Sequence, residues 1–179
     1  LGHDDSGYNL PKMNLHEVEV ENLPDEVIRN KDGDIVMFKD VTKSLVDTSR
    51  EKSESMELRI AKAMEIIDRD PERNYILWHH REAERPGIVY KSVYGSQDNI
   101  LKEKLLMDFS VGKYQILSSK PVIAGQGCNF QKDCYTAIFV GIDYKFNDFI
   151  QAIHRIYRFG QLKAVDIFFI HTQNEREVL

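Results

Sequence analysis

Four short apolar runs, separated by stretches of helical character, limit most strongly what this chain can fold into. They are YILW at 75–78, YQILS at 114–118, TAIFVG at 136–141 and VDIFFI at 165–170. Continuous apolar strands rich in β-branched residues suit a parallel sheet that is covered on both faces. Strands that alternate with helices and connect through right-handed crossovers are typical of layered α/β proteins. The sequence therefore predicts an α/β fold around a mostly parallel central sheet.

The N-terminal third carries weaker signals. Alternating residues in HEVEVE (16–21) predict another strand, whereas residues 40–53 are polar and irregular, which indicates a surface insertion. A helix is expected after Ser53, its candidate N-cap. Its apolar residues recur at helical spacing: Met56, Ile60, Met64 and Ile67. We expect one domain over 1–179, with a leading segment over 1–53 and a core over 54–179.

Several polar positions follow the predicted strands. His79 and His80 follow YILW, residues 118–120 follow YQILS, and Gly95 and Ser96 follow IVYKSVY (88–94). In open parallel sheets, ligands bind beyond the carboxyl ends of the strands. These positions should therefore converge on one edge of the sheet.

Ser96 is also a candidate cap for the next helix. The expected apolar face of that helix consists of Leu101, Leu105 and Phe109. Trp78 and the aromatic residues of 136–146 are expected in the core, and Asp143 in a loop.

The segment QAIHRIYRFGQ (151–161) presents two cations at helical spacing. On a helical wheel, Gln151, Arg155 and Arg158 fall within about 60° of each other. The opposite, apolar face contains Phe149, Ile150, Ile153, Ile156 and Tyr157. Guanidinium groups are planar, always charged and suited to phosphate oxygens. A solvated basic face is the alternative, and it would be favoured for an arbitrary helix.

The spacing Q-A-x-x-R-x-x-R-x-G-Q resembles the last motif of Swi/Snf-type ATPases in helicase superfamily two. SSKPVIAGQGCNFQ (118–131) resembles the preceding motif through Gly125, Gly127 and Asn129. YILWHH and VYGSQD resemble the family's strand-end and Gly-Ser motifs, and the first 21 residues resemble the link into this lobe. The resemblance covers nearly the whole chain in the right order. It is nearest to phage- and prophage-type bacterial members.

This resemblance implies a three-layer α/β/α lobe of the RecA-like kind, the C-terminal lobe of the motor. It implies ATP with Mg²⁺ between two lobes, with Arg158 as the finger on the γ-phosphate and Arg155 beside it. Gln151 would position the arginines or the nucleotide. Gly125 and Gly127 would allow close approach of the backbone, although a plain turn is the usual meaning of an isolated G-x-G.

The resemblance also implies contacts with the backbone of nucleic acid, most naturally double-stranded DNA. The residues concerned are Lys120, Ser118, Ser119, His79, Gly95 and Ser96. Here PVI (121–123) separates the two serines from the glycines, which departs from the family pattern. A solvated lysine is the alternative for Lys120. A buried, hydrogen-bonded histidine is at least as good an interpretation of His79 and His80.

Net charge, apolar runs and cysteine spacing narrow the functions that are compatible with the sequence. A net charge of -5 and a pI of about 5.7 count against a dedicated nucleic-acid-binding domain, although a motor lobe needs only a local basic patch. We expect a cytoplasmic protein without membrane contact, because there is no signal peptide and no apolar run near the ~20 residues of a membrane span. Cys128 and Cys134 fit no zinc spacing and are expected to be reduced thiols.

Two nucleotide-binding motifs do not occur in the sequence. There is no G-x-x-x-x-G-K-[ST] loop and no D-E-x-H-type acidic pair after a strand. The phosphate cradle and the metal ligands would therefore belong to a first RecA-like lobe. Both ends of the chain, Leu1 without a methionine and Leu179 within a helix-like stretch, suggest a piece of a larger protein.

Two functions remain in competition. The first is the second motor lobe of an ATP-dependent DNA translocase or helicase, a hydrolase only as part of the full-length protein and inactive alone. The second is a non-catalytic module that retains this fold and binds nucleic acid or protein. A free-standing small-molecule enzyme is disfavoured, because no nucleophile and base are suitably spaced.

Overall fold

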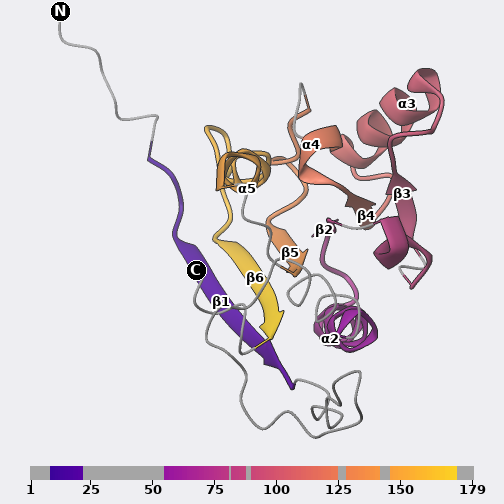
Figure 1. The fold of residues 1–179 in the computed structure, drawn as a ribbon. Helices are drawn as coiled ribbons and strands as arrows, with labels where there is room; N and C mark the ends of the chain where they lie inside the picture. The colour runs from indigo at the N-terminus through magenta and orange to yellow at the C-terminus, as the bar shows by residue number, and fades with distance from the viewer. Residues whose placement is uncertain are drawn as a thin grey trace, which may run out of the picture.

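A computed structural model of the 179-residue chain describes residues 9–21, 55–80, 82–87, 90–124, 128–141 and 146–172. These residues form one sheet of six strands (Figure 1). The strands are β1 (Met13–Val20), β2 (Tyr75–Trp78), β3 (Lys91–Val93), β4 (Ile116–Ser119), β5 (Thr136–Val140) and β6 (Val165–Thr172). The helices are α2 (Met56–Asp68), the 3₁₀ helix η1 (Glu82–Gly87), α3 (Asn99–Ser110), α4 (Pro121–Ala124) and α5 (Phe146–Ile153).

All neighbouring strands are parallel, in the order β1-β6-β5-β2-β4-β3. The four apolar runs of the sequence form the four inner strands, and the shorter or more polar strands β1 and β3 form the edges. This arrangement confirms the predicted α/β class. The predicted strand at 16–21 is confirmed with different limits, since β1 begins at Met13 and ends at Val20.

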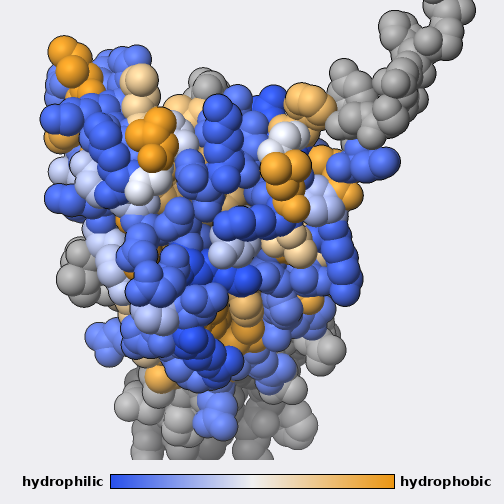
Figure 2. All heavy atoms as spheres, turned by 180° about the vertical axis from the view of Figure 1, so that it is seen from behind, coloured by the Kyte–Doolittle hydropathy of each residue, from blue (hydrophilic) through white to orange (hydrophobic). Residues whose placement is uncertain are grey.

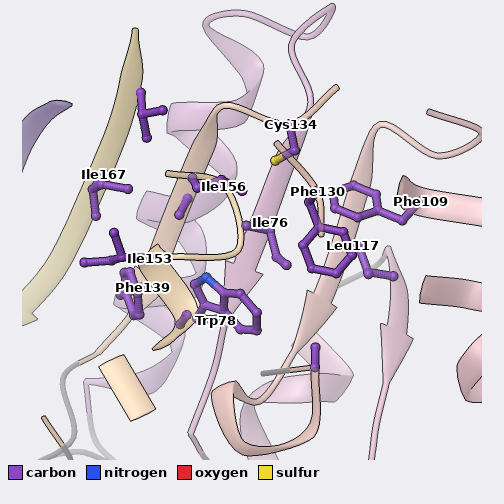
Figure 3. Close-up of a cluster of buried hydrophobic side chains, with 14 of the residues drawn as sticks. Ile76, Trp78, Phe109, Leu117, Phe130, Cys134, Phe139, Ile153, Ile156 and Ile167 are labelled. Atoms are coloured by element: carbon purple, nitrogen blue, oxygen red, sulfur yellow. The ribbon is translucent and has the colours of Figure 1, made fainter. Parts of the chain in front are cut away.

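Helices cover both faces of the sheet (Figure 1). Alternate residues of β2 point to opposite faces, so Tyr75 and Leu77 pack in the core beside α2, whereas Ile76 and Trp78 pack in the core beside α3 and α5. Figure 3 shows this second core, in which Trp78 lies near Phe139 beneath the α5 region. The expectation that Trp78 is a core residue is thus confirmed, with no exposed surface.

Helix α2 follows its predicted pattern. Ile60 and Ile67 are buried, and Met56 and Met64 pack against the same core. The helix begins at Met56 with Ser55 at its N-cap position, so the prediction of Ser53 as the cap is wrong. The suggested insertion at 40–53 and Asp143 lie outside the described residues. The division of the chain at residue 53 therefore stays a prediction.

Helix α3 corrects two expectations. Its N-cap is Asp98 and not Ser96, because the Asp98 carboxylate accepts hydrogen bonds from the amides of Ile100 (2.9 Å) and Leu101 (3.3 Å). A carboxylate suits this position because it satisfies two otherwise unpaired amides and faces the positive end of the helix dipole. Leu101 is exposed, and Leu106 is buried instead, so the buried face of α3 contains Leu106 and Phe109.

The exposed apolar side chains of the described residues do not gather into one large patch on the face seen from behind (Figure 2). Figure 2 shows one face as largely hydrophilic with small, separated apolar areas. Both cysteines are free thiols, and burial raises the pKa of Cys134 to about 12, so it is uncharged at neutral pH. None of the helices in the described part of the chain has the length and apolar character needed to cross a membrane.

Candidate functional site

The segment that carries the two arginines begins as a helix but does not continue as one. Helix α5 ends at Ile153, so the prediction that Arg155 and Arg158 lie on the helix is wrong. The chain tightens there, because the amides of Arg155 and Ile156 bond to carbonyls only three residues back, at 3.2 and 3.1 Å. Gly160, with φ of +89°, completes the turn in a conformation that favours glycine.

The apolar side of the segment lies where the spacing predicts. Ile153 and Ile156 are buried, and Phe149 and Tyr157 pack against the same core (Figure 3). On the polar side, Gln151 is exposed and the two arginines are half-buried. The segment therefore separates a packed side from a cationic side even though its second half is a turn.

Both arginines bind residues 128–131, which belong to the preceding sequence motif. Arg155 donates from Nη1 to the Cys128 carbonyl at 3.2 Å, and its own carbonyl accepts from the Phe130 amide at 2.9 Å. Arg158 donates from Nη1 to the Asn129 side-chain oxygen. The two motifs, more than 20 residues apart in sequence, thus form one structural unit.

A buried glutamine holds this unit together. Gln161 is only 4% exposed, and its Nε2 donates to the carbonyls of Cys134 and Ile156, both at 3.1 Å. Its Oε1 accepts from the Lys163 amide at 2.9 Å. The last glutamine of the motif therefore has a structural part in fixing the turn that follows α5.

The two guanidinium groups influence each other electrically. Burial, and then the positive charge of Arg158, lower the pKa of Arg155 from its ordinary value of 12.5. Arginine nevertheless stays charged at any physiological pH. Within the described residues the buried Nε of Arg155 has no hydrogen-bond partner. An anion bound beside this pair would reduce the repulsion between the two positive charges.

Gly125 and Gly127 lie outside the described residues, so their predicted approach to a nucleotide stays a prediction. No group of His, Cys, Asp and Glu side chains in the described ranges is arranged to hold a metal ion. The described site thus consists of two half-buried guanidinium groups held by residues 128–130.

The predicted nucleic-acid residues do converge on one edge of the sheet, but three of them lie inside the protein. His79, Ser118 and Ser119 have no exposed surface. The Ser118 hydroxyl and His79 Nδ1 share a hydrogen bond of 2.9 Å, and the Ser119 hydroxyl donates to the Val93 carbonyl at 3.0 Å. In this conformation their side chains do not reach solvent, so their contact with nucleic acid stays a prediction.

Burial also sets the charge of the histidine. It lowers the pKa of His79 to about 4, so the ring is neutral at physiological pH. These observations favour the buried, hydrogen-bonded interpretation of His79.

The remaining three positions are accessible. Lys120 forms an ion pair of 2.9 Å with Glu82 of η1, and this contact lowers the pKa of Glu82. Gly95 and Ser96 lie in an exposed turn, where the Gly95 carbonyl accepts from Lys102 Nζ at 2.7 Å. The sequence did not predict a part for Glu82 or Lys102, because neither belongs to a motif. Glu82 is brought to Lys120, and Lys102 to the Gly95 carbonyl, only when the chain folds.

No family model and no curated protein matches this chain. Among solved structures, the chain is similar to the C-terminal part of the Fun30 ATPase domain, with 19% identity and a TM-score of 0.58. The similarity covers 67% of this chain and 43% of that one. At this identity the comparison establishes the fold: a six-stranded parallel sheet with flanking helices, of the kind found in the C-terminal lobe of an ATPase domain.

Proposed function

We propose that this chain is the second motor lobe of a Swi/Snf-type, nucleic-acid-dependent ATPase, a DNA translocase or helicase of the phage- or prophage-related kind. The observation that carries the proposal is the arrangement of Arg155 and Arg158. Both are half-buried and both are held by residues 128–131 beside the parallel sheet. This joins the two most specific sequence motifs into one cationic surface on a fold that an ATPase lobe also has.

In this proposal, ATP with Mg²⁺ binds between this lobe and a first lobe that supplies the phosphate-binding loop and the metal ligands. The magnesium ion would neutralise charge on the phosphates. Arg158 uses one nitrogen for Asn129, and its other N–H groups can face the γ-phosphate oxygens. Arg155 adds a second positive charge, and Gln151, which is exposed, would contact the nucleotide. The same role for Gly125 and Gly127 rests on the sequence motif alone.

DNA would follow the edge formed by the carboxyl ends of β2, β3 and β4. Gly95, Ser96 and Lys120 are the accessible residues there, and contacts to phosphates would position the duplex without reading its sequence. ATP binding would draw the two lobes together and hydrolysis would release them, which moves the protein along the strand.

The alternative is a non-catalytic module of the same fold that binds nucleic acid or protein. The low exposure of His79, Ser118 and Ser119 limits DNA contacts at this edge and so favours a module that binds protein. The motor lobe is supported by the spacing of the two arginines, which resembles the last motif of the ATPase family.

Substitution of Arg158 tests the proposal in the natural full-length protein that contains this chain. We expect Arg158→Ala to lower kcat for DNA-stimulated ATP hydrolysis by ~10³-fold or more with little change in ATP binding, since such arginines act mainly in the transition state. Arg158→Lys should restore little, because the planar fork is lost.

Arg69→Ala is the matched control. Arg69 is an exposed arginine at the end of α2, on the opposite face of the sheet, where it pairs with Glu65. This control should retain wild-type turnover. A wild-type rate in Arg158→Ala would remove Arg158 from the site, and a full-length protein that hydrolyses no ATP would favour the binding module.

A further inference from the structure

Two lysines, Lys120 and Lys102, lie where DNA is proposed to bind, at the carboxyl ends of β3 and β4. The charges of the groups around them differ. Lys120 follows β4 and is only 21% exposed, with Glu82 at 2.9 Å. The hydrogen bond from Lys120 is the main reason that the pKa of Glu82 is lowered, so Glu82 is ionised at neutral pH. Glu82, which also pairs with Arg85 at 3.5 Å, therefore offsets part of the charge of Lys120, and a phosphate would have to compete with a carboxylate already in place.

Lys102 of α3 is held at the same edge by neutral groups. Its Nζ donates to the Gly95 carbonyl at 2.7 Å and to the Asn99 side-chain oxygen at 3.3 Å. Within the described residues no carboxylate forms an ion pair with Lys102. Two acids lie near Lys102 in sequence: Glu103 is adjacent and exposed, and Asp98 directs its carboxylate to the amides of Ile100 and Leu101. Among the described residues, Lys102 is therefore held over the turn at Gly95 by neutral acceptors and not by a carboxylate.

The register of the sheet brings the two lysines to neighbouring strand ends. Val93 of β3 pairs with Ser119 of β4, and the Ser119 hydroxyl binds the Val93 carbonyl at 3.0 Å. Gly95 lies two residues beyond Val93, and Lys120 lies one residue beyond Ser119. Adjacent strands are about 4.8 Å apart, so both positions belong to one exposed surface.

We propose that Lys102 is the principal contact of this edge with a DNA phosphate, and that Glu82 masks Lys120 until a phosphate displaces it. This inference rests on the proposed function, since it names the residues that bind the same partner. Lys102, which lies outside every sequence motif, would then contribute more to DNA binding than Lys120, which lies inside one.

Fluorescence anisotropy of a labelled DNA duplex, titrated with the 179-residue chain across a salt series, tests the inference. Binding should be weak, independent of sequence and strongest at low ionic strength, since it depends on counterion release and the net charge is -5. Lys102→Ala should weaken binding and reduce the slope of log K against log salt by about 1. Lys102→Arg should preserve most of the binding affinity and most of the salt slope, because the positive charge is kept.

Lys104→Ala is the matched control, because Lys104 is an exposed lysine of the same helix, two residues away. It should change the slope much less. Lys120→Ala should have little effect in the wild-type background. Glu82→Gln should increase the slope by about 1, and adding Lys120→Ala to Glu82→Gln should remove that gain.

The outcomes separate two failures. Measurable wild-type binding with equal losses in Lys102→Ala and Lys104→Ala would overturn the inference and leave the proposed function standing. A larger loss from Lys120→Ala than from Lys102→Ala would also overturn it. No binding by the wild-type chain or by Glu82→Gln at the lowest ionic strength would refute both the inference and the DNA contact of the proposed function.

Discussion

At the scale of single residues, position within the fold decides what an ionisable group can do. His79 occupies a strand end where a nucleic-acid contact is predicted, yet burial lowers its pKa to about 4. Its Nδ1 is satisfied by Ser118, and within the described residues its buried Nε2 has no partner. Protonation would place an uncompensated charge in the core, so His79 opposes the folded state in acid.

This produces a predictable pH dependence. The ordinary pKa of histidine is 6.5. Between pH 6.5 and about 4, His79 is therefore protonated in the unfolded chain but stays neutral in the folded protein. The free energy of unfolding should therefore fall as the pH drops from about 6.5 to about 4, with a contribution of up to about 1.4 kcal/mol per pH unit. Urea denaturation across this range should show a shallower slope for His79→Gln than for wild type.

Ser118→Ala is the control for this prediction, since it removes the hydrogen bond but leaves the histidine buried. It should retain the wild-type pH slope even where it lowers stability. An unchanged slope in His79→Gln would contradict the assignment of the effect to His79.

At the scale of elements, glycines mark where helices and strands approach each other closely. After β5, Gly141 has φ of +97°, and a Cβ there would overlap the guanidinium of Arg59. Arg59 of α2 is almost fully buried and donates to the Val140 carbonyl at 3.1 Å. The packing of α2 on the sheet therefore depends on a residue without a side chain at the end of β5.

Gly141→Ala should lower the free energy of unfolding by at least about 2 kcal/mol, because it combines a disfavoured backbone conformation with a steric overlap. Gly95→Ala is the contrasting variant, since no atom lies within 4 Å of a Cβ at that position. It should change stability by no more than about 0.5 kcal/mol. Equal effects of the two variants in urea denaturation would refute this account.

At the scale of the whole molecule, the described residues form one parallel sheet with flanking helices, a fold similar to that of the C-terminal part of an ATPase domain. The similarity covers 43% of a chain that is itself the C-terminal part of an ATPase domain. Phosphoryl transfer needs a phosphate cradle and metal ligands in addition to arginines. Only the arginines occur in this sequence in recognisable form.

The purified 179-residue chain should therefore show no ATP hydrolysis above background, with or without DNA. A coupled phosphate-release assay measures this directly, and the Arg158→Ala chain should give the same trace as wild type. Turnover that DNA stimulates and that Arg158→Ala abolishes would refute the two-lobe proposal, because one lobe would then be sufficient.

The sequence alone determined the sheet. Short apolar runs such as YILW and TAIFVG have the apolar and β-branched character of inner strands, and their spacing leaves room for the crossover helices that parallel connections need. The first and last residues of the edge strands were predicted less well. An edge strand such as β1 is half exposed, so its hydrophobic pattern is weaker. The residue pattern of 151–161 also predicted correctly which side of this segment is buried and which is polar.

Only the tertiary structure decided which polar groups are accessible. The partners of Arg158, Lys120 and His79 are Asn129, Glu82 and Ser118, each at a distance in sequence that no local pattern encodes. The same holds for the end of α5, where bonds from residues 155–161 to residues 128–134 replace further helical turns. Local periodicity specifies which side of a segment is apolar, whereas burial and charge pairing arise when distant segments meet.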